Sequence, residues 1–209
     1  MSASVNSPHT VSGFTPPRPT VLIVTDVFGN TPAVSGLIRQ LDINAIVVSP
    51  WEDEDCGYRS EQDAYQAFIV EGGIARYANK LLAVLREQDA LDFAIGFSAG
   101  ASALWINSED ESMRTIQNAV LFYGSRIRDY RAIKPVCPTR LIFAEQEAAF
   151  APSEVVSELN RSGHHAEIAK GTKHGFMNAY SRGCCVKSQT RYTAELVALI
   201  HASSKKAAA

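Results

Sequence analysis

The chain lacks the features that mark several large functional classes. Its 209 residues include 20 Lys and Arg against 22 Asp and Glu, for a formal charge of −2, so no basic field attracts a nucleic-acid backbone. The longest near-apolar stretch, Leu91 to Ile106, contains Asp92 and Ser98 and is shorter than the roughly 18 apolar residues of a membrane span. We therefore expect neither nucleic-acid binding nor membrane spanning.

Cysteine is also scarce. Cys56 and Cys137 are isolated, and Cys184 and Cys185 are adjacent, where a mutual disulfide would be strained. This spacing predicts neither a disulfide framework nor a zinc site, and we expect no metal. The N-terminus has no charged start followed by an apolar segment, as a secretory signal would. These absences favour a reduced, cytoplasmic setting.

What is present is an ordinary globular composition, with 46% apolar residues. The length favours one domain, which we place at residues 20–203, after a flexible arm at 1–19 and before a frayed tail at 204–209. Short apolar runs predict six strands, at Val21–Val27, Ala45–Ser49, Phe93–Phe97, Ala119–Tyr123, Leu141–Ala144 and Ala166–Lys170. Helices are expected at 32–41, 73–87, 99–106, 153–161 and 188–201, and a polar connection at 51–66.

Strands that alternate with helices predict an α/β fold. We expect a three-layer α/β/α sandwich around a mainly parallel, doubly wound sheet of about six strands, because right-handed crossovers place helices on both faces. The expected strand order is 2-1-3-4-5-6. In such sheets ligands bind beyond the carboxyl ends of the strands, so the loops that follow the strands are the place to look for a site.

The sharpest motif is Gly96-Phe97-Ser98-Ala99-Gly100, which matches G-x-S-x-G between an apolar strand and a helix rich in small residues. In this strand–turn–helix elbow the serine occupies a strained turn, and its neighbours two positions away must be small so that strand and helix can approach. A serine there projects over a helix N-terminus, where N–H groups can stabilise an oxyanion. The alternatives are a turn kept for packing and a phosphate-binding turn. The G-x-G-x-x-G spacing of dinucleotide sites is absent, which weakens the second.

A nucleophilic serine needs a base and an acid, which follow it in this order in the elbow fold. His174 lies in the loop after the sixth strand, at the correct end of the sheet. For the acid we favour Glu147, which lies deeper in the loop after the fifth strand, over the alternative Glu145. The remaining histidines lie in the predicted arm, before the sixth strand or near the tail: His9, His164, His165 and His201.

The loop after the first strand adjoins this predicted site, because strands one and three are neighbours in the expected order. The N–H of Val27, with that of Ala99, would then form a two-donor oxyanion hole. Asp26 would position the serine or a substrate, or else be a solvated turn residue. Three aromatic residues from loops at this end would either line an apolar substrate pocket or pack in the core: Phe28, Tyr123 and Phe176.

These landmarks together resemble the dienelactone hydrolase family of the α/β-hydrolase superfamily. The matching segments are VLIVTDVFG, GFSAG, AVLFYG, PTRLIFAEQEAAFAP and KHGFMN, spread over most of residues 20–180. The resemblance implies a short α/β-hydrolase fold and a catalytic triad of Ser98, Glu147 and His174. It also implies an oxyanion N–H at Val27 and a carboxylate at Asp26.

The sequence also departs from the family's usual pattern at four positions. Ser98 replaces the cysteine of the founding enzymes, Glu147 replaces an Asp, and Asp26 replaces a Glu. Asn178 stands where dienelactone enzymes have an arginine that helps to hold the substrate carboxylate. A serine at the elbow implies a more general esterase chemistry, on an ester, lactone or thioester, than the cleavage of dienelactone.

We therefore expect a serine hydrolase that acts on a small-molecule carboxylic ester, lactone or thioester and needs no cofactor. The first alternative is a non-catalytic small-molecule binding protein on the same scaffold. The second is a flavodoxin-like nucleotide or flavin binder, against which the lack of a phosphate-cradling glycine loop argues. A monomer and a homodimer are both compatible with the sequence.

Overall fold

The computed structural model describes residues 18–52, 57–58 and 60–207. Nearly all of the predicted N-terminal arm and Cys56 lie outside these residues. The strands are β1 Thr20–Val24, β2 Asn44–Val48, β3 Phe93–Phe97, β4 Asn118–Phe122, β5 Thr139–Gln146 and β6 His165–Lys173. The helices are α1 Pro32–Leu41, α2 Glu61–Val70, α3 Gly73–Arg86, α4 Ala99–Asn107, α5 Pro152–Arg161 and α6 Val186–Ala207, with short 3₁₀ turns η1 Glu111–Met113 and η2 Ser125–Asp129.

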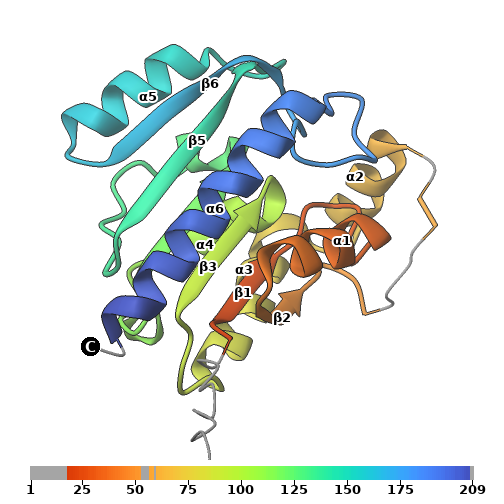
Figure 1. The fold of residues 1–209 in the computed structure, drawn as a ribbon. Coiled ribbons are helices and arrows are strands. Elements are labelled where there is room, and N and C mark those ends of the chain that lie inside the picture. The colour runs from red at the N-terminus through yellow and green to blue at the C-terminus, as the bar shows by residue number, and fades with distance from the viewer. Residues whose placement is uncertain (1–17, 53–56, 59, 208–209) are drawn as a thin grey trace, which may run out of the picture.

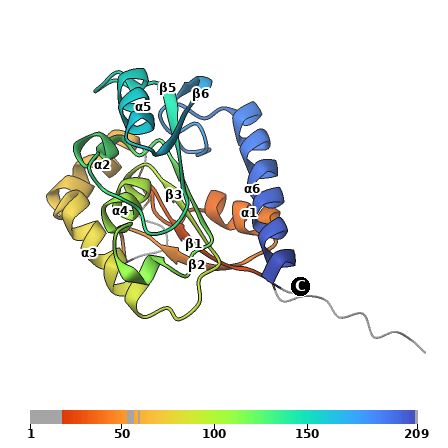
Figure 2. The ribbon, with the colours of Figure 1, turned by 90° about the vertical axis from the view of Figure 1, so that its left-hand side faces the viewer.

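The six strands form one sheet in the order β2-β1-β3-β4-β5-β6, and every neighbouring pair is parallel. This confirms the predicted strand order. Helices α1 and α6 cover one face, and α3, α4 and α5 cover the other (Figures 1 and 2). The predicted three-layer α/β/α architecture is therefore confirmed.

The central strands β1, β3 and β4 are almost entirely apolar because both of their faces are covered. In β1, Leu22 and Val24 belong to the core beneath α3 and α4, while Val21 and Ile23 belong to the core beneath α1 and α6. All five residues of β3 are buried. This central strand is thereby held rigidly, and it ends directly at Ser98.

The structure differs from the predicted elements in three places. The first strand ends at Val24, not Val27, because the chain turns as the Gly29 N–H donates to the Asp26 carbonyl. Helix α6 continues to Ala207, beyond the predicted end at 201, so it overlaps the predicted frayed tail.

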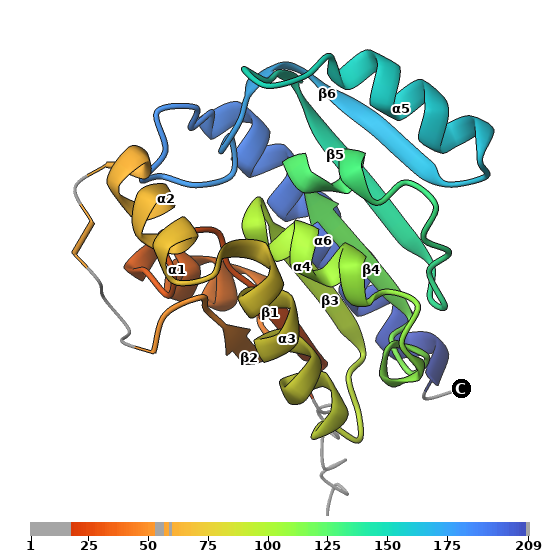
Figure 3. The same ribbon diagram turned by 180° about the vertical axis from the view of Figure 1, so that it is seen from behind.

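The predicted polar connection at 51–66 was wrong in its second part, where α2 begins at Glu61. The Ser60 hydroxyl accepts a hydrogen bond from the Asp63 N–H and caps the helix. This Ser-x-x-Asp pattern is a helix-start signal. The helix has a weak apolar face that buries only Ala64 and Phe68, which is why periodicity did not reveal it. Seen from behind, α2 lies near the carboxyl end of the sheet (Figure 3).

Candidate functional site

Ser98 occupies a strained turn between β3 and α4. Its φ of 50° and ψ of −109° lie outside the regions that non-glycine residues ordinarily adopt. A Cβ atom at Gly96 would lie 2.7 Å from the Ala101 Cα, and one at Gly100 would overlap the carbonyl oxygens at the end of β1. Both glycines of the motif are thus needed for the close approach of strand and helix, which confirms the reason given for the spacing.

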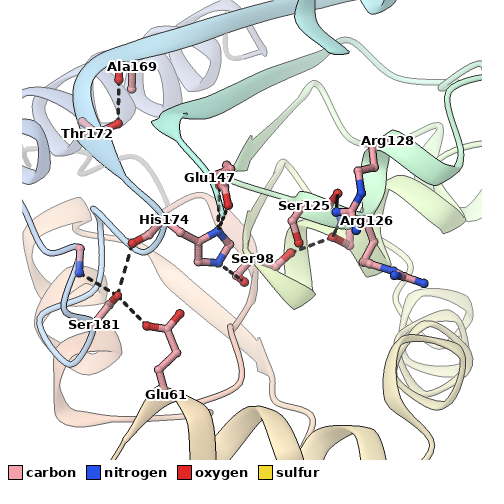
Figure 4. Close-up of polar contacts among 12 residues, drawn as sticks. Glu61, Ser98, Ser125, Arg126, Arg128, Glu147, Ala169, Thr172, His174 and Ser181 are labelled. Carbon is pink, nitrogen blue, oxygen red and sulfur yellow. Dashed lines mark hydrogen bonds and ion pairs between the residues drawn. The ribbon is translucent and has the colours of Figure 1, made fainter. Parts of the chain in front are cut away.

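The structure brings the side chains of Ser98, His174 and Glu147 together (Figure 4). The Ser98 Oγ lies 2.8 Å from the His174 Nε2, and the His174 Nδ1 lies 2.8 and 3.0 Å from the two Glu147 carboxylate oxygens. The carboxylate can only accept, so Nδ1 carries the proton and Nε2 accepts from the serine hydroxyl. The three residues form one hydrogen-bonded chain from acid to hydroxyl.

The environment of His174 favours its protonated form. Burial alone would lower the pKa of the imidazole, but the hydrogen bond to Glu147 and the negative charges of Glu147, Glu61 and Asp26 outweigh it. The net effect raises the pKa of His174 above its usual value. An imidazole in this position is well suited to take up a proton from a neighbouring hydroxyl.

Glu145, the alternative acid, points to a different partner. Its carboxylate accepts a hydrogen bond from the Gly171 N–H at 2.8 Å and pairs with Lys170 at 3.1 Å. These contacts lower the pKa of Glu145. Glu145 therefore ties β5 to β6, while Glu147, with a side chain only 6% exposed, faces His174.

The two predicted oxyanion donors lie on segments that pack against each other. The first turn of α4, which contains Ala99, contacts the end of β1 through Gly100, and Val27 follows β1. In the described part of the chain neither the Val27 N–H nor the Ala99 N–H donates to another protein group. The loop after β1 is held in place by Trp51, whose indole N–H donates a hydrogen bond to the Val27 carbonyl at 2.8 Å. Both N–H groups are therefore without a protein acceptor among the described residues.

Asp26 is a buried carboxyl group, not a solvated turn residue. It is 6% exposed and accepts hydrogen bonds from the Phe28 N–H at 3.0 Å and from the Asn178 amide at 2.5 Å. Desolvation raises its pKa to about 6, although the two hydrogen bonds oppose this shift. Asn178, which occupies the position of the arginine in dienelactone enzymes, is therefore already engaged by a carboxylate of the protein.

The three predicted aromatic residues have different surroundings. Phe176 is fully buried against Phe122, Tyr123 and Tyr192, so it packs in the core. Tyr123 is also fully buried, with its ring 5.1 Å from that of His174. Phe28 is 6% exposed and lies beside Tyr180. Of the two alternatives predicted for Phe176, its burial favours packing in the core.

Sequence reasoning missed three residues that support the histidine loop, namely Glu61, Ser181 and Gly183. Glu61, from the first turn of α2, points toward Ser181, and the Ser181 hydroxyl lies 3.0 Å from its carboxylate and 3.4 Å from the His174 carbonyl (Figure 4). Gly183 packs so closely on that carbonyl that a Cβ atom would overlap it. The missed signal was the helix cap at Ser60, which places Glu61 over the site.

Because the charge of Glu61 helps to raise the pKa of His174, we expect Glu61→Gln to lower it. Glutamine still accepts a hydrogen bond from Ser181, so the loop keeps its support while one negative charge is removed. The measurement is an NMR titration of the His174 imidazole. Glu71→Gln, at the other end of α2, is the matched control and should leave the His174 pKa unchanged. An unchanged or higher His174 pKa in Glu61→Gln would contradict this assignment.

Within residues 18–52, 57–58 and 60–207, no group of three or more His, Cys, Asp or Glu side chains is arranged to hold a metal ion. Over the same residues, none of the helices combines the length and apolar character required to cross a bilayer.

Comparison with known proteins identifies relatives of this chain. YczH of Bacillus subtilis, an uncharacterized protein, is 30% identical over 169 residues, which cover 78% of this chain and 82% of YczH. No protein-family model matches the chain.

Two solved structures show the same fold. A candidate dienelactone hydrolase from Klebsiella pneumoniae matches with a TM-score of 0.68 and 18% identity, over 93% of this chain and 90% of that one. A dienelactone hydrolase-like promiscuous phosphotriesterase from metagenomic libraries matches with a TM-score of 0.58 and 16% identity, over 91% and 88%. The α/β-hydrolase fold and, at the level of the fold, the resemblance to dienelactone hydrolases are confirmed.

Proposed function

We propose that this chain, which belongs to one family with YczH and has the α/β-hydrolase fold of dienelactone hydrolases, is a serine hydrolase acting on carboxylic esters, lactones or thioesters. The observation that carries the proposal is the hydrogen-bonded chain from Glu147 through His174 to Ser98. This chain of hydrogen bonds ends on a serine that lies in a strained turn at a helix N-terminus. The N–H groups of Val27 and Ala99 are the proposed oxyanion donors. This arrangement has the parts that acyl transfer to a serine requires.

In the first half of the reaction, the Ser98 Oγ attacks the substrate carbonyl carbon while its proton passes to the His174 Nε2. The N–H groups of Val27 and Ala99 stabilise the negative oxygen of the tetrahedral intermediate. The carbon–oxygen or carbon–sulfur bond to the leaving group then breaks, and the leaving group takes the proton from Nε2. The acyl group remains bonded to Ser98.

In the second half, a water molecule gives a proton to the His174 Nε2 and its oxygen attacks the acyl carbon. The new tetrahedral intermediate releases the Ser98 oxygen, which regains the proton from Nε2, and the carboxylic acid product leaves. The His174 Nδ1 keeps its proton throughout and donates it in the hydrogen bond to Glu147. This bond keeps the imidazole oriented, and the carboxylate charge stabilises the imidazole cation. Each proton that is transferred in the proposed reaction therefore passes through the His174 Nε2.

The charges around the site favour uncharged substrates. Asp26 and Glu61 both lie near His174, and the Asn178 amide is bound to Asp26. A substrate carboxylate would face these negative groups, and Asn178, at the position of the arginine in dienelactone enzymes, carries no charge to pair with it. We therefore propose that neutral acyl groups are preferred to those that carry a carboxylate.

The test combines active-site labelling with a substrate panel. A fluorophosphonate probe should label the wild-type protein at Ser98, as mass spectrometry of the digested protein would show. p-Nitrophenyl butyrate should be cleaved with a higher kcat/KM than mono-p-nitrophenyl succinate, which has a similar acyl length but carries a carboxylate. A thioester and a lactone extend the panel. Absence of both labelling and turnover would overturn the proposal in favour of a non-catalytic binding protein.

A further inference from the structure

A cavity lies between α1 and α6 and reaches the ends of the central strands. These two helices cover one face of the sheet (Figures 1 and 2). Its volume is about 350 Å³, and its walls are α1, α6, residues 177–179 and the ends of β1 and β3. None of Ser98, His174 and Glu147 lines it. The size falls within the range of small-molecule sites, about 300–1,000 Å³.

The cavity exists because both helices turn short side chains toward each other. Ala33 and Gly36 of α1 line one wall, and Thr190 and Thr193 of α6 line the other. In each pair the residues are three apart, so they share one face of their helix. The apolar residues of α1 are consequently incompletely covered, and Leu41 is its single buried residue. Part of the cavity wall is therefore made of apolar side chains that α1 and α6 leave uncovered.

The inner end of the cavity carries polar groups without partners. Tyr123 and Thr31 both line it and are 0% and 6% exposed, and the hydroxyl of each lacks a hydrogen-bond partner in the described part of the chain. The Tyr123 hydroxyl lies beside the backbone of Met177 without forming a hydrogen bond of ordinary geometry. Buried hydroxyls without partners are costly, so a ligand group that bonds to them would be stabilised.

The charge of the lining limits the kind of ligand. Asp26 is the one acidic residue among the residues that line the cavity, and no Lys, Arg or His is among them. A negatively charged ligand would lose its hydration without gaining a cation and would also face Asp26. A head group that donates hydrogen bonds avoids both costs.

We propose that this cavity is a binding site for a small amphiphile with an apolar chain and a head group that donates hydrogen bonds and bears no negative charge. The chain lies between α1 and α6, and the head group lies at the inner end beside Asp26, Tyr123 and Thr31. The cavity adjoins the proposed active site, because Asp26 and Tyr123 also lie near His174. None of the triad side chains lines it, so binding there can be measured without turnover.

The experiment compares two probes of equal chain length by titration calorimetry, namely octanamide and octanoate. We expect saturable binding of octanamide to the wild-type protein at pH 8, and binding of octanoate that is weaker by about tenfold or more. Failure of octanamide to bind, or equal affinity for octanoate, would overturn the proposal.

Variants that fill the cavity locate the site. A Cβ atom at Gly36 would have no neighbour closer than the Arg39 guanidinium, at 3.9 Å, so the helix tolerates a side chain there. Gly36→Leu should weaken octanamide binding by about tenfold or more, while the matched control Gly36→Ala should retain it. Thr193→Leu fills the cavity from α6 and should have the same effect. Unfolding curves identify a variant that fails to fold, and undiminished binding in a folded leucine variant would refute the location.

Discussion

Replacement of Ser98 by alanine is expected to lower kcat/KM for p-nitrophenyl butyrate by about 10³-fold or more. In the proposed mechanism the Ser98 hydroxyl is the only protein group that bonds to the acyl carbon. Without it the oxyanion donors and the imidazole remain, but no acyl-enzyme forms. His174→Ala should cause a similar loss, and the double variant should be little worse than either single one, because the two residues act as a unit. Steady-state kinetics on the three variants measures this.

The fold should survive these changes. The Ser98 side chain contributes one hydrogen bond, to His174, and its strained backbone is held by Gly96 and Gly100. Ser153→Ala, on the exposed surface of α5, is the control for an unspecific effect of a serine substitution and should keep full activity. If Ser98→Ala retained wild-type turnover and probe labelling, the serine mechanism would be excluded.

Replacement of Glu147 by glutamine is expected to lower kcat/KM by about 10²-fold or more. The amide removes the negative charge that stabilises the His174 cation, and its NH₂ end would favour the wrong imidazole tautomer. The same change lowers the pKa of His174, because the hydrogen bond and charge of Glu147 both raise it. The acidic limb of the remaining activity should therefore move to lower pH, which a pH–rate profile would show.

Glu145→Gln is the matched control, two residues away on the same segment. Glu145 pairs with Lys170 and Gly171 and not with His174, so its replacement should change kcat/KM by no more than about threefold. Equal losses in both variants would show a shared structural effect, and a larger loss in Glu145→Gln would reverse the assignment of the acid.

Much of the fold was predictable because its signals are local. Both faces of the sheet are covered, so the central strands are short apolar runs bounded by turn residues. The elbow at Ser98 was equally clear, because the close packing at Gly96 and Gly100 allows no side chain. Helix α2 escaped prediction because most of its surface is exposed, and its apolar pattern is correspondingly weak.

The sequence by itself determined the strand order, the elbow and the order of serine, acid and histidine along the chain. It could favour one of two glutamates, but only the tertiary structure decided their partners, because Lys170 and Gly171 of the neighbouring strand engage Glu145. The structure alone also revealed Glu61 above the histidine loop and the cavity between α1 and α6. Strands and the elbow follow from residues that are neighbours along the chain. The glutamate partners, the position of Glu61 and the cavity depend on the distances between elements that are far apart in the sequence and pack together only in the fold.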